Sequence, residues 1–284
     1  MRAFLAEFLS DPRVVELPRA VWLPLLHGVV LNVRPRRSAE KYAAIWTAEG
    51  SPLAVHTARQ ARLLAAATGA QVEYAMRYGE PAIAAALARL RAPFVVVPLY
   101  PQYSASATES VRDCLPPNVP FIESFYDHPA YIGALAAGVE THWAEHGRGE
   151  KLVMSFHGLP QRAVNRGDPY PRQCLATARL LAEKLNLSKT EFLATFQSRF
   201  GWAKWLQPYT EPTLIEMARA GLRRVDIVCP GFVSDCLETL EEIGIGARKS
   251  FLAAGGSEFR LVPCLDESRE WIAALAAISA RTAP

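Results

Sequence analysis

Short apolar runs that alternate with longer helical stretches constrain the fold of this chain more than any other feature. The runs occupy residues 72–76, 94–98, 119–124, 152–156, 192–196, 225–228 and 259–262. Segments rich in Ala, Leu and Glu lie between them, at residues 81–91, 131–145, 171–185, 212–220 and 236–252. Unbroken apolar strands separated by helices are typical of parallel sheets covered on both faces. The sequence therefore predicts an α/β fold of the doubly wound type.

The length of the chain, 284 residues, is more than one such sheet requires. Because a unit of this kind needs only about 150 residues, we expect two Rossmann-like doubly wound domains with parallel sheets. The boundary is predicted after residue 124, which gives an N-terminal domain of residues 1–124 and a C-terminal domain of residues 125–284. The last helical stretch, residues 267–280, can pack on either domain.

Composition and missing motifs exclude several classes of protein. The net charge is only +3, and the arginines are dispersed apart from the cluster Arg34-Pro-Arg-Arg37, so we expect no binding of nucleic acid. The G-x-G-x-x-G and G-x-x-x-x-G-K-[ST] fingerprints are absent, which disfavours a nucleotide-linked oxidoreductase. The G-x-S-x-G elbow of an acyl-transfer serine is absent as well.

Cysteine usage and hydropathy indicate the cellular compartment. The five cysteines form no C-x-x-C pair, which favours a reducing environment over a disulfide framework. The longest apolar stretch, residues 20–33, is shorter than the roughly 20 residues that a membrane span needs. We therefore expect a cytoplasmic protein whose contact with a membrane, if it has one, is at the surface.

Polar and aromatic residues gather where the predicted strands end. They lie at residues 76–79, 100–106, 157–160, 197–201 and 230–235. Ligands of open α/β sheets bind beyond the carboxyl ends of the strands. So many aromatic and polar side chains at that edge predict a cleft for a large, flat and partly apolar ligand.

Two groups of residues are candidates for chemistry. His157 directly follows a predicted strand; its imidazole suits a divalent metal such as ferrous iron, although a hydrogen-bonded core histidine fits the pattern too. Asp235 followed by Glu238 fits a helix cap. Glu238 and Glu242 lie four residues apart on one helix face, where a metal or a shared proton would compensate their like charges. The spacing alone leaves capping and catalysis open.

Six stretches, taken in order, resemble the ferrochelatases. The two most specific are Ser155-Phe-His-Gly-Leu-Pro160 and the segment from Gly231 to Glu242, with the pattern S-D-x-x-E-T-L-x-E. The others are residues 76–79, 98–104, 165–171 and 197–208, and the resemblance extends from about residue 4 to residue 271. It implies a class II chelatase-like fold. It also implies a lyase that inserts ferrous iron into protoporphyrin IX, the terminal step of haem biosynthesis.

The resemblance assigns expected roles to individual residues. His157 and Glu238 match the family's metal site, and Glu242 and Asp235 match the acidic row beside it; these four residues are the expected catalytic set. The residues expected to bind the porphyrin are Arg77, Tyr78, Tyr100, Ser104, Ser106, Ser198, Trp205 and Phe232. Trp205 and Phe232 fit plain core packing equally well. Arg36 or Arg37 is a candidate partner for the propionates.

The resemblance also bears on cofactors and location. Ferrous iron is expected as substrate, with no tightly bound cofactor. An iron–sulfur cluster, which usually needs four thiolates, is not expected because only Cys264 lies near the C-terminus. Residues 21–33 match the apolar lip over the family's active site, which suits peripheral contact with the inner membrane surface.

The chain begins inside the segment that follows the family's first strand and loop. That loop contributes to the family's porphyrin pocket, so we expect this form to be less stable and less active than an extended one. A start codon assigned too late is the favoured explanation over a shortened protein, and translating the upstream DNA tests it.

Two rival functions remain at this stage. One is a related chelatase that inserts cobalt or nickel into a reduced tetrapyrrole, which would favour a histidine-rich site. The other is a non-catalytic porphyrin or haem carrier, which would need the pocket but not the acidic row of Glu238 and Glu242.

Overall fold

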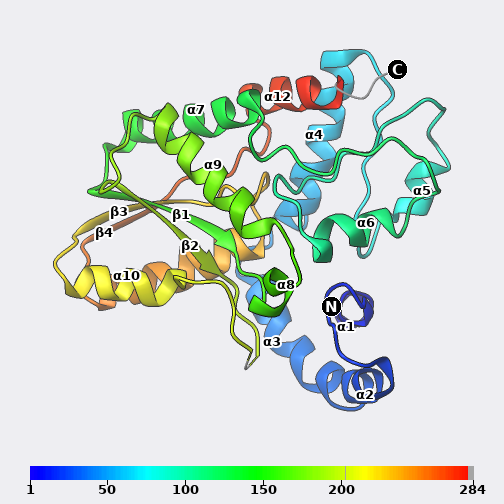
Figure 1. Cartoon of the computed structure of the whole chain (residues 1–284), viewed down its shortest axis with the longest axis horizontal. Helices are drawn as coiled ribbons and strands as arrows, with labels where there is room; N and C mark the ends of the chain where they lie inside the picture. Colours follow the sequence, from blue (N-terminus) through cyan, green and yellow to red (C-terminus); the bar gives the residue numbers. More distant parts are fainter. Residues whose placement is uncertain (202, 281–284) are drawn as a thin grey trace.

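The computed structural model describes residues 1–201 and 203–280. The first half is mainly helical (Figure 1). Its elements are α1 (Arg2–Ser10), α2 (Arg19–Leu25), η1 (Leu26–Val30), α3 (Leu31–Ala43), α4 (Pro52–Thr68), α5 (Ile83–Leu87), η2 (Ala105–Glu109) and α6 (Ser110–Arg112), where η denotes a π-helix.

The second half alternates strands and helices. Its elements are α7 (Pro129–His146), β1 (Lys151–His157), α8 (Gln161–Asn165), α9 (Tyr170–Lys184), β2 (Phe192–Gln197), α10 (Thr210–Arg219), β3 (Arg224–Val228), η3 (Glu238–Ala247), α11 (Arg248–Ala253), β4 (Glu258–Leu261) and α12 (Arg269–Ser279). The four strands form one parallel sheet in the order β2-β1-β3-β4. The predicted α/β class with a parallel sheet is confirmed.

Alternating side chains of β1 build a core on each face of the sheet. Leu152, Met154 and Phe156 are buried in the core formed with α7, α9 and α12. Val153 points to the opposite face and is buried in the core formed with α10, η3 and α11. Figure 1 shows these helices on either side of the strands. Burial on both faces explains why the strands read as unbroken apolar runs in the sequence.

The expectation of a sheet in each half holds only for the second half. Within the described part of the first half, residues 72–76, 94–98 and 119–124 form single bridges, Met76 with Ala82 and Val96 with Phe121, and no ladder. Val96 donates its N–H to the carbonyl of Pro120 and accepts from Ile122 N. Prolines at 98 and 120 lack the N–H that would continue this pairing, so the extended segments stay isolated.

The last helix joins the two halves of the chain. α12 packs on α7 and also on α4 of the first half. Its Trp271 is fully buried against the rings of Phe125 and Tyr131. Leu64 of α4 belongs to the same core, so one cluster spans both sides of residue 124. The division into domains at that residue stays a prediction.

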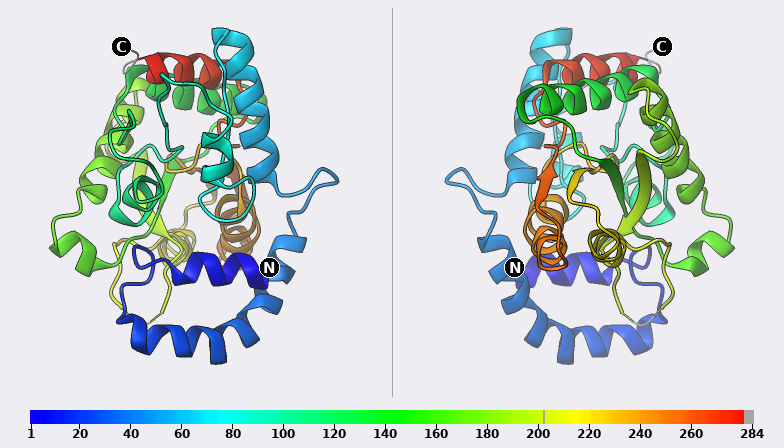
Figure 2. Two further views of the ribbon diagram at one scale, coloured as in Figure 1. Left: turned by 90° about the vertical axis from the view of Figure 1, so that its right-hand side faces the viewer. Right: turned by 90° about the vertical axis from the view of Figure 1, so that its left-hand side faces the viewer.

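The segment α2–η1–α3, residues 19–43, is named the arm. Figure 2 shows it as a curved helix along one end of the molecule, below α1. Pro24 lies inside α2, and the π-helical turn follows at once. Proline removes a helical hydrogen bond and pushes against the preceding turn, which accounts for a bend at this point. The arm and α1 share a small core that includes Leu5, Leu9 and Trp22.

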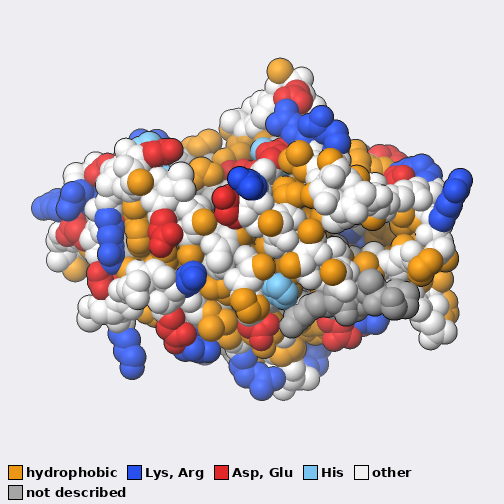
Figure 3. All heavy atoms as spheres, turned by 90° about the horizontal axis from the view of Figure 1, so that it is seen from above, with side chains coloured by type: hydrophobic (Ala, Val, Ile, Leu, Met, Phe, Trp, Pro, Cys, Tyr) orange, Lys and Arg blue, Asp and Glu red, His pale blue; other side chains and the backbone are white. Residues whose placement is uncertain are grey.

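The surface mixes charges of both signs. Figure 3 shows acidic and basic side chains interspersed with hydrophobic ones over the face formed by α7, α12 and α4. Across residues 1–201 and 203–280, the helices lack the length and apolar character that crossing a bilayer would require.

Candidate active site

The carboxyl ends of β1, β2 and β3 lie at one edge of the sheet because the strands are parallel. β1 ends on His157, which stands beside Gln197 at the end of β2. The loop after β3 brings Phe232 to the same place, where its ring centroid lies 6.4 Å from that of His157. The Trp205 ring centroid lies 6.5 Å from that of the imidazole, with the two planes tilted by 54°. Both aromatic side chains are half-buried, and Phe232 also packs against the core that includes Val153.

The His157 ring is oriented by its own backbone. Its Nδ1 lies 2.7 Å from the carbonyl oxygen of Gly158. A carbonyl can only accept, so Nδ1 is the donor, and in the neutral imidazole Nε2 keeps a free lone pair. Tyr170 donates to the carbonyl of His157 at 2.9 Å, which fixes the backbone behind the ring. The imidazole is half-buried at the end of the strand.

The buried amide of Gln197 joins three elements. Its Oε1 accepts from Ser155 Oγ on β1 at 2.7 Å, and its Nε2 donates to the carbonyl of Glu238 at 2.7 Å. Gln197 is 4% exposed, so both bonds lie away from water. In the sequence, Gln197 begins the family-like stretch 197–208 but has no expected role. A buried polar residue at the end of an apolar strand is the signal that marks it.

The helix that carries the acidic residues is a π-helix, η3, which begins at Glu238. π-helical turns are rare and concentrate at functional sites. Glu242 accepts two hydrogen bonds from Ser198, one from the backbone N–H and one from Oγ, both at 2.6 Å. Ser198 has a left-handed backbone with φ of 64°, which aims both donors at one carboxylate. Ser198 therefore positions Glu242, whether or not it also contacts a ligand.

Asp235 does not cap the helix. The N-cap of η3 is Leu237, which makes no capping bond with its side chain. The buried carboxylate of Asp235 instead accepts from Thr239 Oγ1 at 2.7 Å. The capping hypothesis for Asp235 and Glu238 is wrong, because the chain enters the helix two residues later than that motif requires.

The charge of Glu238 acts on two tyrosine side chains. Burial, with a smaller contribution from the negative charge of Glu238, raises the pKa of Tyr42 to about 12. Burial also raises the pKa of Tyr100, while the charge of Arg77 lowers it and that of Glu238 raises it. Tyr100 keeps 39% of its surface open to solvent.

Arg77 and Tyr78 are held by a buried carboxylate. Arg77 Nη2 and Tyr78 OH lie 2.6 Å and 2.8 Å from Asp11 Oδ2, and Ser110 Oγ donates to the same oxygen at 2.6 Å. Burial alone would raise the pKa of Asp11, but these hydrogen bonds and the charge of Arg77 lower it. Two nitrogen atoms of Arg77 are therefore occupied by hydrogen bonds within the protein, to Ser110 and Asp11.

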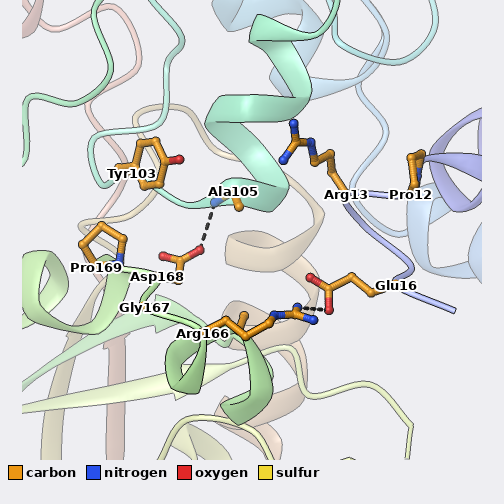
Figure 4. Close-up of a pocket in the computed structure, with 10 residues that line it drawn as sticks. Pro12, Arg13, Glu16, Tyr103, Ala105, Arg166, Gly167, Asp168 and Pro169 are labelled. Carbon is orange, nitrogen blue, oxygen red and sulfur yellow. Dashed lines mark hydrogen bonds and ion pairs between the residues drawn. The ribbon is translucent and has the colours of Figure 1, made fainter.

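Ser104 and Ser106 lie on either side of the start of η2. Their hydroxyl oxygens are 3.3 Å apart, and Ser104 caps the helix by accepting from Ala107 N. A cavity of about 490 Å³ adjoins them at Ala105, whose N–H donates to Asp168 at 2.9 Å (Figure 4). None of the expected catalytic residues lines it. Its lining residues are Pro12, Arg13, Glu16, Tyr103, Ala105, Ala163, Arg166, Gly167, Asp168 and Pro169.

Within the cluster Arg34-Pro-Arg-Arg37, Arg34 is half-buried, whereas Arg36 and Arg37 are exposed. Arg34 stacks on Phe200, with Cζ 4.5 Å from the ring centroid, and its buried Nη1 has no hydrogen-bond partner among the described residues. Burial lowers the pKa of Arg34. Arg36, in contrast, is 91% exposed at its side chain and pairs weakly with Glu40. An unpaired buried guanidinium calls for an anionic partner, which makes Arg34 a better carboxylate ligand than Arg36 or Arg37.

The described residues contain no group of three or more His, Cys, Asp or Glu side chains arranged to hold a metal. Cys114, Cys174, Cys229, Cys236 and Cys264 are all free thiols. The expectation that no iron–sulfur cluster is bound stays a prediction.

Comparison with known proteins identifies a family. The family model described as Ferrochelatase matches residues 1–283. The ferrochelatase of Azoarcus sp. is 58% identical over 292 aligned residues, which cover 97% of this chain and 80% of the relative. That of Bordetella pertussis is 52% identical, with 97% and 81% covered.

A solved structure resembles this one in fold. CbiX, described as the terminal enzyme for the biosynthesis of siroheme in denitrifying bacteria, is 17% identical. The likeness covers 87% of this chain and 94% of CbiX, with a TM-score of 0.52. It supports the predicted chelatase-like α/β fold.

The packing around Gly158 yields a first prediction. A Cβ at this position would lie 2.6 Å from the carbonyl oxygen of Gln197 and 3.1 Å from Trp205 Cε3. Gly158→Ala should therefore lower the free energy of unfolding by about 1–3 kcal/mol, the usual cost of overpacking. Urea denaturation measures it. Gly138→Ala is the control, because that glycine lies in α7 with open space around it and should gain about 0.5–1 kcal/mol. Equal stability of the two variants would contradict the packing described.

Proposed function

This chain belongs to the ferrochelatase family, and we propose that His157 and the acidic row of Glu238, Glu242 and Asp235 carry out its reaction. That reaction is the insertion of ferrous iron into protoporphyrin to form haem. The observation that supports this assignment is the position of Gln197, which neighbours His157 in the sheet and donates to the carbonyl of Glu238 at the start of η3. The carboxyl ends of β1 and β2 and the acidic helix are therefore joined through one buried side chain.

The reaction makes three physical demands. The aquated cation must lose water, two pyrrole N–H protons must leave, and the flat macrocycle must pucker to expose its nitrogen atoms. With Nδ1 as the donor, neutral His157 presents Nε2 and so can bind iron or accept a pyrrole proton. The carboxylate of Glu238, the first residue of η3, can do either as well. Binding that favours the puckered ring over the flat one lowers the barrier.

The proposed binding surface for the macrocycle is aromatic. The rings of Trp205 and Phe232 lie within 6.5 Å of that of His157, and the ring of Tyr100 is partly open to solvent. These rings offer flat apolar area to a flat apolar ligand. Ser104 and Ser106, whose hydroxyl oxygens are 3.3 Å apart, are the proposed partners of the ligand's polar groups.

Arg34 is the proposed partner of a propionate. Its Nη1 is buried without a partner in residues 1–201 and 203–280, while the Phe200 ring holds the guanidinium plane in place. A carboxylate at this point would complete a charge-assisted bond in a partly dry setting. Iron is the substrate, and we propose that no resident cofactor is needed.

The arm has an exposed apolar stripe that suits a membrane surface. Leu17, just before the arm, and Val21, Leu25, Val29 and Val33 within it recur every four residues and are 44–64% exposed. A spacing of four residues rotates about 40° beyond one full turn of an α-helix, so an apolar stripe with this spacing would drift around the helix. The π-helical turn at η1 has more residues per turn and offsets this drift. The exposed Arg19, Arg36 and Arg37 flank the stripe and suit anionic headgroups. We propose that the arm contacts the inner face of the membrane, from which a poorly soluble porphyrin can enter.

His157→Ala tests the metal-site assignment. It should lower turnover by roughly 100-fold or more, because a direct metal or proton contact is lost. Porphyrin affinity, read from fluorescence quenching, should stay close to that of the wild type. A His157→Ala enzyme with near-normal turnover would refute the assignment.

Arg34→Met tests the proposed propionate partner. It should raise the KM for porphyrin and leave kcat unchanged.

Glu238→Gln separates charge from packing at the start of η3. The amide keeps the size and the hydrogen-bonding capacity of the side chain but cannot accept a proton. We expect a roughly 100-fold loss of turnover, with the free energy of unfolding changed by only about 0.5 kcal/mol. Turnover and thermal unfolding measured on one preparation decide the matter. A stability loss with intact turnover would mean that Glu238 is structural.

Vesicle flotation tests the proposed membrane contact. The protein should float with vesicles that contain phosphatidylglycerol, and less so with purely zwitterionic ones. The double variant Val29→Glu/Val33→Glu should abolish flotation, because two charges would enter the apolar stripe. Leu175→Glu is the control, since Leu175 is 54% exposed on α9 and lies outside the arm. If both variants float like the wild type, the stripe has another use.

A further inference from the structure

One family-like stretch of the sequence, residues 165–171, has no role in the chemistry proposed above. It connects the end of α8 to the start of α9. Gly167 has a left-handed backbone with φ of 99°, a conformation that favours glycine and lets the chain turn between the two helices. The turn places Asp168 just before α9 and Tyr170 as the first residue of that helix.

The carboxylate of Asp168 accepts two backbone hydrogen bonds, one local and one distant. Its Oδ1 accepts from the N–H of Tyr170 at 3.0 Å, as in the local turns that Asp commonly forms before a helix. Its Oδ2 accepts from the N–H of Ala105 at 2.9 Å, 63 residues earlier in the chain (Figure 4). A local turn needs only the first bond. The second bond ties a loop of the first half of the chain to the start of α9.

Ala105 lies between the two serines that are proposed to contact the porphyrin. Ser104 is buried and caps η2 by accepting from the N–H of Ala107. Ser106 is half-buried, and its hydroxyl oxygen lies 3.3 Å from that of Ser104. Since Ser106 is the next residue after Ala105, the bond from Asp168 fixes the backbone from which the Ser106 side chain projects.

Neighbouring contacts hold the same loop on α9 independently of Asp168. The N–H of Tyr103 donates to Gln173 Oε1 at 2.6 Å, and Gln102 Nε2 donates to Thr177 Oγ1 at 3.0 Å. The loop therefore stays attached to α9 when the bond from Asp168 is removed. We expect a change at Asp168 to move the start of η2 locally and not to unfold the protein.

Tyr170 connects the same turn to the proposed metal-site histidine. Its hydroxyl donates to the carbonyl of His157 at 2.9 Å. Burial raises the pKa of Tyr170 well above its ordinary value, so the hydroxyl keeps the proton that it donates. Ala105, Asp168, Tyr170 and His157 are thus joined in sequence by three hydrogen bonds. The loop that carries Ser106 and the strand end that carries His157 share one support.

We propose that Asp168 is a positioning residue that sets the Ser106 hydroxyl relative to the imidazole of His157. This inference rests on the proposed function, in which Ser106 contacts the porphyrin and His157 belongs to the metal site. A rigid macrocycle has a fixed distance between its polar rim and its nitrogen atoms. A site that binds both must therefore hold its hydroxyl group and its imidazole at a matching distance. Asp168 acts through the backbone of Ala105 and does not touch the porphyrin.

Asp168→Ser is the main test. A serine hydroxyl still forms the local turn with the N–H of Tyr170, but it is shorter and has no second oxygen for Ala105. In anaerobic iron insertion we expect the KM for protoporphyrin to rise about tenfold, the loss of one charge-assisted hydrogen bond, with kcat lowered less than about threefold. Initial rates from the porphyrin absorption bands measure both constants, and circular dichroism checks that the variant is folded.

The double variant with Ser106→Ala distinguishes positioning from a general loss of structure. Ser106→Ala alone should raise the KM for protoporphyrin. If Asp168 acts through Ser106, adding Asp168→Ser to that variant should change the KM by less than about twofold, because coupled residues are not additive. An unrelated structural defect would instead multiply the two effects.

Tyr170→Phe tests the other end of the link. The ring is retained, but the carbonyl of His157 loses its donor, so the backbone behind the imidazole is held less firmly. We expect kcat to fall about fivefold with the KM for protoporphyrin unchanged, the opposite signature to that of Asp168→Ser. A Tyr170→Phe enzyme whose kcat equals that of the wild type would contradict the link to His157.

Glu191→Ser is the matched control. Glu191 also accepts a backbone N–H, from Ser188 at 2.8 Å, but it lies just before β2, at the opposite edge of the sheet from His157. Both kinetic constants should stay at the wild-type values in this variant.

An unchanged KM in Asp168→Ser, while Ser106→Ala raises it, would overturn the positioning role and leave the proposed function intact. A KM effect of full size in the double variant would do the same. An unchanged KM in Ser106→Ala would overturn the serine assignment together with this inference. Failure of the wild type to insert iron would overturn the proposed function itself.

Discussion

The buried side chain of Gln197 is the contact on which the rest of the site depends. It is the last residue of β2, and its amide binds β1 through Ser155 and η3 through the carbonyl of Glu238. The next residue, Ser198, has a left-handed backbone and donates two hydrogen bonds to the carboxylate of Glu242. One strand end therefore sets the distance between the imidazole of His157 and the acidic helix. Buried polar groups that are fully paired specify one arrangement in this way.

A π-helix at the start of the acidic row fits this constraint. η3 carries Glu238 and Glu242, whose like charges repel when both are ionised. The two carboxylates have different surroundings in the structure. Glu242 is bound by Ser198, whereas the charge of Glu238 acts on Tyr42 and Tyr100. Two carboxylates in different environments can take different parts in moving protons.

Periodicity predicted the parts of the fold that follow from local pattern. The four strands of the second half and the helices between them were placed from apolar runs and prolines, because burial on both faces leaves a clear pattern. His157, Trp205 and Phe232 were predicted from strand ends and resemblance, and the structure brings them together. The extended segments of the first half form single bridges, because prolines 98 and 120 stop their pairing. The sequence pointed to Arg34 only as part of a basic cluster and to Gln197 only as part of a motif, because the burial and hydrogen bonding of their side chains become visible only in three dimensions.

The most direct test of this account is anaerobic mixing of the protein with protoporphyrin and ferrous iron, with the absorption spectrum followed over time. The account predicts that the free porphyrin bands collapse into those of haem over many turnovers, with two protons released for each haem formed. A porphyrin that binds the protein but keeps its metal-free spectrum would contradict the account, and would identify the cleft as that of a carrier.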